Sequence, residues 1–374
     1  MRHIIRYNLL SMPTATQNAL LPWAALNILT KKRYEFLVET YGSLDDAWSV
    51  LDQNLLKKLG CREDTILKTM NEIEELDLNQ HQAFLEKNDI RFLTIEDEEY
   101  PQTLREIADS PVFLFAKGNI DLLREPSIAI VGTRNISAYG KRVVEMLVPA
   151  FVRAGLVTVS GLAIGIDAAV AKETMDAGGK TIAVLGHGLG AIYPKANERL
   201  AKEITETDGL LLSEYPLHIR PDKFTFPARN RIIAGISIGT VVAEAAAQSG
   251  SLITASFALE DGKDVFAVPG SVFDPNMEGT HHLIQKSGAK LVTSAEDILL
   301  ELGVVMPDAD QKSAYRAQTP DEELLLKHLT TMPQTVDDLT EKSGMAVSSI
   351  NTTLTLMELK GGAKNVGRGQ WVRL

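Results

Sequence analysis

Small, hydroxyl-bearing and basic residues follow the short apolar runs in the middle of the chain. They are Gly132, Thr133, Arg134, Ser160, Gly161, Ser249, Gly250 and Ser251. Glycine lets backbone N–H groups approach a ligand closely, and the N-terminus of a helix presents unpaired donors that favour anions. A single glycine turn is explained equally well by local structure. Several such turns along one edge of a sheet predict an anion-binding crevice, and phosphate is the anion we expect.

Further polar and aromatic residues lie in the later loops and could complete this crevice. The predicted contacts among them are Lys195, Phe226, Arg229, Asn230 and Arg231. Arginine makes bidentate contacts with phosphate, and lysine supplies a flexible point charge. An aromatic ring such as Phe224 or Phe226 could also stack on a base, although core packing is the commoner use of such a side chain.

Three acids near the ends of the apolar runs have a structural interpretation as well as a chemical one. Asp167, Glu214 and Glu244 could each act as a general base, cap a helix or pair with an arginine. An ion pair of Arg229 or Arg231 with Glu214 or Glu244 would brace the sheet instead of binding a ligand. We therefore predict structural or ion-pair roles for the acids, and the division of work between the arginines stays open.

Catalytic and metal-binding patterns are weak. His187 lies alone in a loop, and Ser160 lacks the Gly-x-Ser-x-Gly turn of serine hydrolases. His281 and His282 lack companion ligands at metal spacing. Neither a complete Gly-x-Gly-x-x-Gly fingerprint nor a Walker A motif is present, which disfavours the usual NAD and ATP sites. We expect no catalytic residue, no metal and no cofactor.

The apolar runs indicate the elements that would position these residues. They lie at 127–131, 156–159, 181–185, 210–212, 240–243 and 264–268, separated by helical stretches. Continuous apolar strands between helices predict an α/β fold, an extended Rossmann-like, doubly wound parallel sheet with both faces covered. Ligands of such sheets bind outside the carboxyl ends of the strands, where the loops above would meet.

The remaining chain predicts two flanking domains. Helical periodicity dominates residues 1–88, the α/β core covers 89–305, and a polar linker spans 306–320. Residues 321–374 predict helices around a turn at Ser343 and Gly344, closed by a strand, as in a winged helix. The lone Cys61 and the absence of a leader or a long apolar run favour a cytoplasmic protein without a membrane span.

Charge limits how such a protein could bind nucleic acid. The 374 residues carry a net charge of −11, which argues against electrostatic coating of DNA because phosphate contacts drive non-specific binding. An acidic protein can still bind through one focused basic cleft. The placement of the basic residues therefore decides the question.

At these residues the sequence resembles the DprA (Smf) family, and the matching segments follow the family order across about residues 100–293. They are Tyr100-Pro101, Ile130-Val131-Gly132-Thr133-Arg134, Val159-Ser160-Gly161-Leu162-Ala163-Ile164-Gly165-Ile166-Asp167, Tyr193-Pro194, Ser213-Glu214-Tyr215-Pro216, Phe226-Pro227-Ala228-Arg229-Asn230-Arg231-Ile232-Ile233-Ala234-Gly235, Glu244, Ser249-Gly250-Ser251 and Val268-Pro269-Gly270. As a set these segments are highly specific.

The resemblance implies a core that binds single-stranded DNA, forms a homodimer and carries no catalytic activity. It also implies RecA loading and displacement of single-strand-binding protein during natural transformation, with sterile-alpha-motif-like or helix-hairpin-helix-like helices before the core and a winged helix after it. Arg134 and Lys195 match the family positions that line the DNA pocket. Ala171 stands where members usually carry histidine, so any role of that imidazole is absent or moved.

Two other functions compete with this interpretation. A nucleotide-processing enzyme of the lysine-decarboxylase-like (phosphoribohydrolase) group would share the fold, but the segment around Glu244 lacks that group's Pro-Gly-Gly-x-Gly-Thr loop. A transcription factor built on the tail would need a basic recognition helix, yet residues 348–359 contain no lysine or arginine. Protein contacts are at least as good an interpretation of the tail.

Overall fold

The computed structural model describes residues 15–286, 288–304, 315, 317–330, 333–367 and 369–373. The chain divides into two compact units, Met1–Val305 and Met306–Leu374. The finer division that the sequence suggests, with a boundary at residue 88 and a linker over 306–320, stays a prediction. None of the described helices has the length and apolar character needed to span a bilayer.

The helical pattern at the start of the chain forms a layer of short helices. They are α1 (Ala15–Leu26), α2 (Lys31–Tyr41), α3 (Leu44–Ser49), α4 (Gln53–Lys58), α5 (Glu63–Glu75) and α6 (Leu78–Lys87). Polar residues cap four of these helices by accepting a backbone hydrogen bond, as N-cap side chains do: Thr30, Ser43, Asp52 and Asp77. Helix α6 contacts strand β1 (Ile90–Thr94), which places the end of this layer against the sheet.

A nine-stranded sheet forms the core, in the order β1-β2-β6-β5-β4-β3-β7-β8-β9. Its other strands are β2 (Phe113–Gly118), β3 (Ser127–Gly132), β4 (Val157–Ser160), β5 (Thr181–Val184), β6 (Leu210–Ser213), β7 (Gly239–Glu244), β8 (Asp264–Ala267) and β9 (Lys290–Leu291). Strands β3 to β9 are parallel, which confirms the doubly wound core. The sheet gains a mixed edge that the sequence did not indicate, because β2 runs antiparallel to both β1 and β6.

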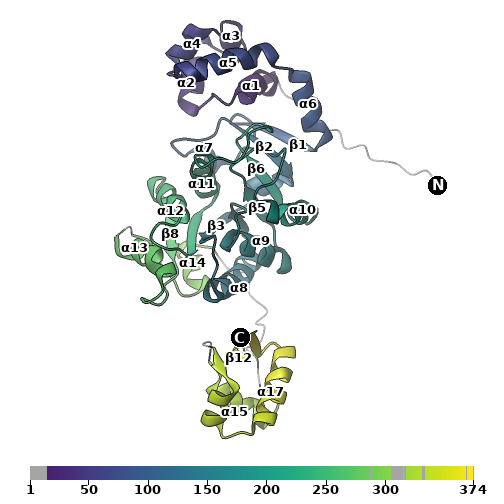
Figure 1. The fold of residues 1–374 in the computed structure, drawn as a ribbon, viewed down its shortest axis with the longest axis vertical. Helices are drawn as coiled ribbons and strands as arrows, with labels where there is room; N and C mark the ends of the chain where they lie inside the picture. The colour runs from purple at the N-terminus through teal and green to yellow at the C-terminus, as the bar shows by residue number, and fades with distance from the viewer. Residues whose placement is uncertain are drawn as a thin grey trace, which may run out of the picture. The chain divides into compact units, whose positions relative to one another are not determined.

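Helices cover both faces of the sheet (Figure 1). Their bounds are α7 (Gln102–Arg105), α8 (Ala138–Arg153), α9 (Ile166–Asp176), α10 (Glu198–Glu206), α11 (Thr225–Ile236), α12 (Ser251–Glu260), α13 (Glu278–Lys286) and α14 (Ala295–Glu301). Helices α8 and α9 contact one another and strands β3 and β4, whereas α11 and α12 pack together on the other side. Burial on both faces explains why the strands read as uninterrupted apolar runs.

The second unit has the helices and strands of a winged helix. Its elements are α15 (Pro320–His328), β10 (Gln334–Thr335), α16 (Val336–Ser343), α17 (Val347–Leu359), β11 (Ala363–Gly367) and β12 (Gln370–Arg373). Gly344 ends α16 in the left-handed conformation, which supplies the predicted turn. The buried Glu322 carboxylate accepts a hydrogen bond from Lys360 Nζ at 2.9 Å, and this contact lowers the Glu322 pKa to about 2.

Candidate functional site

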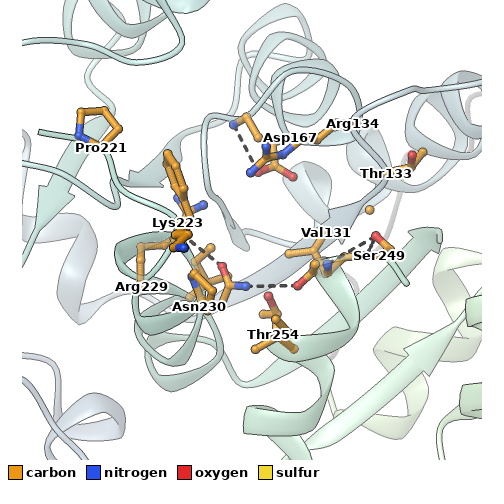
Figure 2. Close-up of a pocket in the computed structure, with 18 of the residues that line it drawn as sticks. Val131, Thr133, Arg134, Asp167, Pro221, Lys223, Arg229, Asn230, Ser249 and Thr254 are labelled. Atoms are coloured by element: carbon orange, nitrogen blue, oxygen red, sulfur yellow. Dashed lines mark hydrogen bonds between the residues drawn. The ribbon is translucent and has the colours of Figure 1, made fainter. Parts of the chain in front are cut away.

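A large hollow lies where the strand order reverses between β3 and β7. Doubly wound sheets bind their ligands at such a switch point, outside the carboxyl ends of the strands. The cavity measures about 1040 Å³ and is lined by the turns after β3, β4 and β7 and by the first turns of α11 and α12. We call it the strand-end pocket. Figure 2 shows Arg134, Asp167, Asn230, Lys223 and Ser249 arranged around this hollow.

The turn after β3 forms one wall of the pocket. Gly132, Thr133 and Arg134 all line it, as the sequence suggests. The backbone of Thr133 is fixed, because its N–H donates to the Glu244 carbonyl at 2.7 Å and its carbonyl accepts from the Ile166 N–H at 3.1 Å. The Arg134 guanidinium lies 5.5 Å from the centroid of the Phe226 ring, a distance at which cations and aromatic faces attract.

The turn after β7 forms the opposite wall. Ser249, Gly250 and Ser251 line the pocket, and Ser251 is the first residue of α12. The two serine hydroxyls lie 2.7 Å apart, and Asn230 Nδ2 donates to the Gly250 carbonyl at 3.2 Å. Asn230 thereby ties α11 to the start of α12. The two hydroxyls, which stand at the positive N-terminal end of α12, are suited to an anion.

A buried arginine forms the floor. Arg229 donates from Nη1 to the Gly161 carbonyl at 2.7 Å and to the Val184 carbonyl, and from Nε to Asn230 Oδ1 at 3.2 Å. Burial lowers the Arg229 pKa to about 10, against the opposing effect of the Asp167 carboxylate. Gly161 makes room for this group, since a Cβ there would lie 2.4 Å from the guanidinium nitrogens.

Asp167 lies beside this arginine at the start of α9. One carboxylate oxygen accepts from the Gly161 N–H at 3.1 Å and from the Ala163 N–H at 3.3 Å. Burial raises the Asp167 pKa, and the positive charge of Arg229 opposes that rise. The predicted structural role of Asp167 agrees with this geometry, but its electrostatic partner is Arg229.

Arg231 lies outside the strand-end pocket, although the sequence placed it among the DNA contacts. Its guanidinium makes a bidentate pair with Glu214 at 2.7 and 2.8 Å and a further contact with Asp109 at 3.0 Å. The alternative that one arginine braces an acid is therefore the observed arrangement for Arg231 and Glu214. One residue separates Arg229 from Arg231, so a helix turns the two side chains toward different surroundings.

Glu244 does not pair with an arginine. Its side chain is fully buried, Oε2 accepts from the Ser137 N–H at 3.1 Å, and Oε1 has no hydrogen-bond partner among the described atoms. The carboxylate thus faces the N-terminus of α8 and does not line the strand-end pocket. The suggested ion pair of an arginine with Glu244 is wrong, and the acid that the enzyme hypothesis would use points away from the cavity.

Two other predicted contacts also lie outside the cavity lining. The Ser160 hydroxyl is buried and donates to the Ile130 carbonyl at 3.0 Å, which makes it a link between strands. Lys195 is exposed at the start of the 3₁₀ turn Lys195–Asn197, beyond Tyr193, which does line the pocket. Ala171, at the position of the family histidine, is buried in α9 and does not line the pocket.

Phe224 and Phe226 do not lie in the hydrophobic core, although core packing was the commoner expectation for such side chains. Phe224 is 72% exposed beneath the Lys223 ammonium, which lies 4.9 Å from its ring centroid. Phe226 lines the cavity and packs against the Tyr193 ring at 5.8 Å. His187, by contrast, is buried and bonds to neighbouring backbone groups, including the Gly188 carbonyl at 3.0 Å.

Sequence reasoning missed two cations of the pocket. Arg220 and Lys223 line it from the loop that precedes α11, and both are exposed. The basic segment 220–223 before the Phe226 motif is the signal that could have found them. With Arg134 and Arg229 the lining holds four cationic side chains against two acids, Asp167 and Asp222. The site is thus positive in a chain of net charge −11.

The described residues contain no group of three His, Cys, Asp or Glu side chains that could hold a metal ion. His281 Nε2 instead lies 3.3 Å from the Gly270 carbonyl. The chemistry that the described pocket offers is recognition of an anion by guanidinium, ammonium and hydroxyl groups. An aromatic wall beside these groups adds a surface for a flat ligand.

Comparison with known families matches two segments of the chain. Residues 91–303 match the model of DNA recombination-mediator protein A, and residues 309–367 match the DprA winged helix domain.

Individual relatives are similar over most of the chain. A DNA processing protein DprA of Streptococcus pneumoniae is 50% identical over 244 residues, covering 65% of this chain and 83% of the relative. Protein Smf of Escherichia coli is 40% identical over 299 residues, covering 78% and 79%.

Two solved structures share the fold. DNA processing protein A of Streptococcus pneumoniae has a TM-score of 0.65 and 43% identity, covering 78% of this chain and 99% of that one. The Helicobacter pylori protein, whose structure concerns its single-stranded DNA binding mode, has a TM-score of 0.51 and 30% identity, covering 57% and 95%.

Proposed function

The chain belongs to the family of DNA recombination-mediator protein A, and we propose that its strand-end pocket binds single-stranded DNA. The observation that carries this proposal is the gathering of Arg134, Arg220, Lys223 and Arg229 around one cavity at the switch point of the sheet. Phosphate contacts by cations dominate the affinity of proteins for nucleic acid. A single-strand specificity is in keeping with the binding mode reported for the Helicobacter pylori relative.

We propose different roles for the pocket residues. Arg134, on the exposed side, contacts phosphate directly, together with the exposed Lys195 at the edge. The hydroxyls of Thr133, Ser249 and Ser251 add hydrogen bonds, and Gly132 lets the strand approach the turn closely. Arg229 directs its donors to backbone carbonyls, so it supplies positive potential and holds the floor in shape.

The aromatic wall favours an unstacked strand over a duplex. The Phe226 ring lies between Tyr193 and Arg134 and could stack on a base whose faces are free. Every base has such a face, so we expect binding that tolerates sequence. A duplex keeps its bases stacked and would reach only the outer cations.

The wider role that we propose follows the family. The protein would protect incoming single-stranded DNA, displace single-strand-binding protein and load RecA during natural transformation. It would act in the cytoplasm as a homodimer formed through the α/β core, without catalysis and without a cofactor. The buried Glu244, turned away from the strand-end pocket, gives no support to the enzyme alternative.

Fluorescence anisotropy with oligo-dT and a matched duplex, repeated across salt concentrations, tests the binding. We expect tighter binding of the single strand and a logarithm of affinity that falls linearly with the logarithm of salt. Changing Arg134 and Lys195 together to alanine should weaken binding and flatten the slope. The matched control, Lys57→Ala with Arg62→Ala, removes the same charges from exposed positions of the helical layer. A folded R134A/K195A protein with unchanged affinity and slope would overturn the site, and a duplex preference would overturn the function.

A further inference from the structure

A second hollow lies beside the strand-end pocket. It measures about 900 Å³ and is lined by one face of α6, by the loop after β5 over residues 187–193 and by the loop after β6 over residues 217–221. We call it the α6 groove. The site described above leaves its purpose unexplained.

The lining of the α6 groove is rich in flat rings and apolar side chains. Phe84 and Tyr193 are 39% and 49% exposed, so both rings are open to a ligand. His81 and His218 form an edge-to-face pair with ring centroids 6.4 Å apart. The charged members of this wall are Lys87 and Arg220.

Its charge complements a polyanion. The lining contains no aspartate or glutamate among the residues that the structure describes. The chain as a whole has 49 acids against 38 lysines and arginines, so an acid-free wall of this size departs from the composition of the protein. Cations on an apolar surface without acids attract an anionic ligand that also has flat, apolar parts.

The α6 groove continues directly from the strand-end pocket. Tyr193, Arg220 and Pro221 line both cavities. Across this shared wall the Arg134 guanidinium lies over the Phe226 ring at 5.5 Å, and that ring packs on Tyr193 at 5.8 Å. A strand held by its phosphates at Arg134 therefore has an aromatic path toward Phe84.

We propose that the α6 groove binds unstacked bases of the same DNA strand whose phosphates occupy the strand-end pocket. This inference rests on the proposed function and extends it to a base-binding subsite built partly by the N-terminal helices. Single-stranded nucleic acids are held elsewhere by the same combination, a positive groove beside aromatic side chains on which bases stack. Helix α6 would thus lengthen the binding path beyond the sheet.

Phe84→Ala in the full chain tests the subsite. Phe84 is half exposed and does not belong to the buried core of the helical layer, so the variant should fold. We expect its Kd for oligo-dT of about 30 nucleotides to rise about fivefold, the loss of one stacking platform. Leu67→Ala, on the exposed face of α5, is the matched control and should leave the Kd unchanged.

An abasic strand separates stacking from charge. Such a strand keeps the phosphates and lacks the bases, so wild type and Phe84→Ala should bind it with equal affinity. The loss of affinity caused by removing the bases and the loss caused by removing the Phe84 ring should therefore not be additive. Photocrosslinking of an oligonucleotide carrying iodouracil should also label the peptides that contain His81 or Tyr193.

The outcomes distinguish the subsite from the function on which it rests. If R134A/K195A weakens oligo-dT binding but Phe84→Ala does not, the base-binding subsite is wrong and the strand-end pocket stands. Equal loss of affinity for the abasic strand in Phe84→Ala would show a structural effect and would also overturn the subsite. If the wild-type protein binds no oligo-dT at all, the proposed function itself fails. Crosslinks confined to Met306–Leu374 would exclude the α6 groove as the path.

Discussion

The strand-end pocket and helix α17 of the winged helix are both places where a protein of these folds could meet DNA, yet they differ in charge. Four cationic side chains line the pocket against two acids. Helix α17 carries no lysine or arginine and one acid, Glu358, and it exposes Val347, Leu356 and Leu359. Lys360, directly after the helix, pairs with the buried Glu322.

An acidic chain can thus keep its surface for an anionic ligand in one unit and an apolar surface for another kind of partner in the other unit. Positive potential is focused at the end of the sheet, where low-dielectric walls strengthen it. The exposed surface of α17 has apolar side chains and no cation, so it fits a protein better than it fits a phosphate backbone. The difference in charge supports the proposed DNA site in the strand-end pocket and favours protein contacts for the winged helix.

The largest effect should come from removing the cation at the pocket floor. Arg229→Met leaves the Gly161 and Val184 carbonyls without their donor and removes the positive charge that offsets the burial of Asp167, and each buried polar group left unsatisfied costs about 1–3 kcal/mol. Urea denaturation should show this loss, with oligo-dT affinity falling in parallel. Adding Asp167→Asn should restore part of the stability. A variant as stable as wild type would contradict the claim that the charge and hydrogen bonds of Arg229 stabilise the pocket floor.

Gly161→Ala should have the next largest effect. Its Cβ would meet the Arg229 guanidinium at 2.4 Å, so the arginine must leave the Gly161 and Val184 carbonyls. Overpacking of this kind costs about 1–3 kcal/mol, measurable as a lower midpoint of thermal unfolding. Gly250→Ala is the control within the same pocket, because a Cβ there would meet no atom within 4 Å. Equal effects of the two changes would contradict the packing argument.

Removing the exposed cations at the pocket should have an intermediate effect. Arg134→Ala should weaken oligo-dT binding about tenfold, because it removes a bidentate phosphate ligand from the pocket wall. Lys195→Ala should weaken binding only about twofold, since Lys195 stands beyond the lining and offers a single screened charge. Anisotropy titrations of both single variants measure the difference. A larger effect for Lys195→Ala than for Arg134→Ala would indicate that the strand runs nearer Lys195, outside the strand-end pocket.

A smaller effect, confined to the second unit, should follow from acid. The Lys360 contact lowers the Glu322 pKa from 4.5 to about 2, so this carboxylate stabilises the unit at pH above about 4.5. That stabilisation is lost as pH falls from about 4.5 toward about 2. Hydrogen exchange of α15 and α17, corrected for intrinsic rates, should rise at pH 3 relative to pH 5. The Glu322→Gln protein should lack this dependence.

The smallest effect on DNA binding should come from α17 itself. Ser348→Glu with Asn351→Glu places two negative charges on its exposed face. We expect less than about a twofold change in oligo-dT affinity, because the face does not meet phosphate. Ser249→Glu, one added charge in the strand-end pocket, should abolish most of the binding. A strong loss of oligo-dT affinity in the α17 variant would show that α17 also contacts DNA and would contradict the assignment of DNA contacts to the pocket alone.

The sequence allowed the parallel strands β3 to β8 to be predicted because burial makes each a continuous apolar run, whereas the short, exposed strand β9 gave no such signal. The same pattern placed the turns at Gly132 and Gly250 together, because the carboxyl ends of parallel strands lie at one edge of the sheet. The antiparallel strands β1 and β2 were missed because they lie before the first repeat of strand and helix. Their apolar residues gave no signal that distinguished direction.

The orientation of single side chains was harder to predict. Arg229 and Arg231 lie in one motif, and only the three-dimensional packing shows that one meets carbonyls and the other Glu214. The exposed Phe224 and the α6 groove depend on loops whose path the sequence pattern does not fix. Residue types therefore predicted the kind of groups in the pocket more accurately than they predicted which residues line it.

The attachment of Arg229 to the carbonyls of Gly161 and Val184 has a consequence for rates. These bonds join the pocket floor to the turn after β4 and to the last residue of β5, so the floor acquires its shape when the sheet folds. Little conformational entropy of the floor is then left to lose when DNA binds. Association should then be a single concentration-dependent step, fast at low salt and without a slow isomerisation. Variants of Arg229, Arg134 and Lys195 should differ from wild type chiefly in faster dissociation of the strand and less in its association rate.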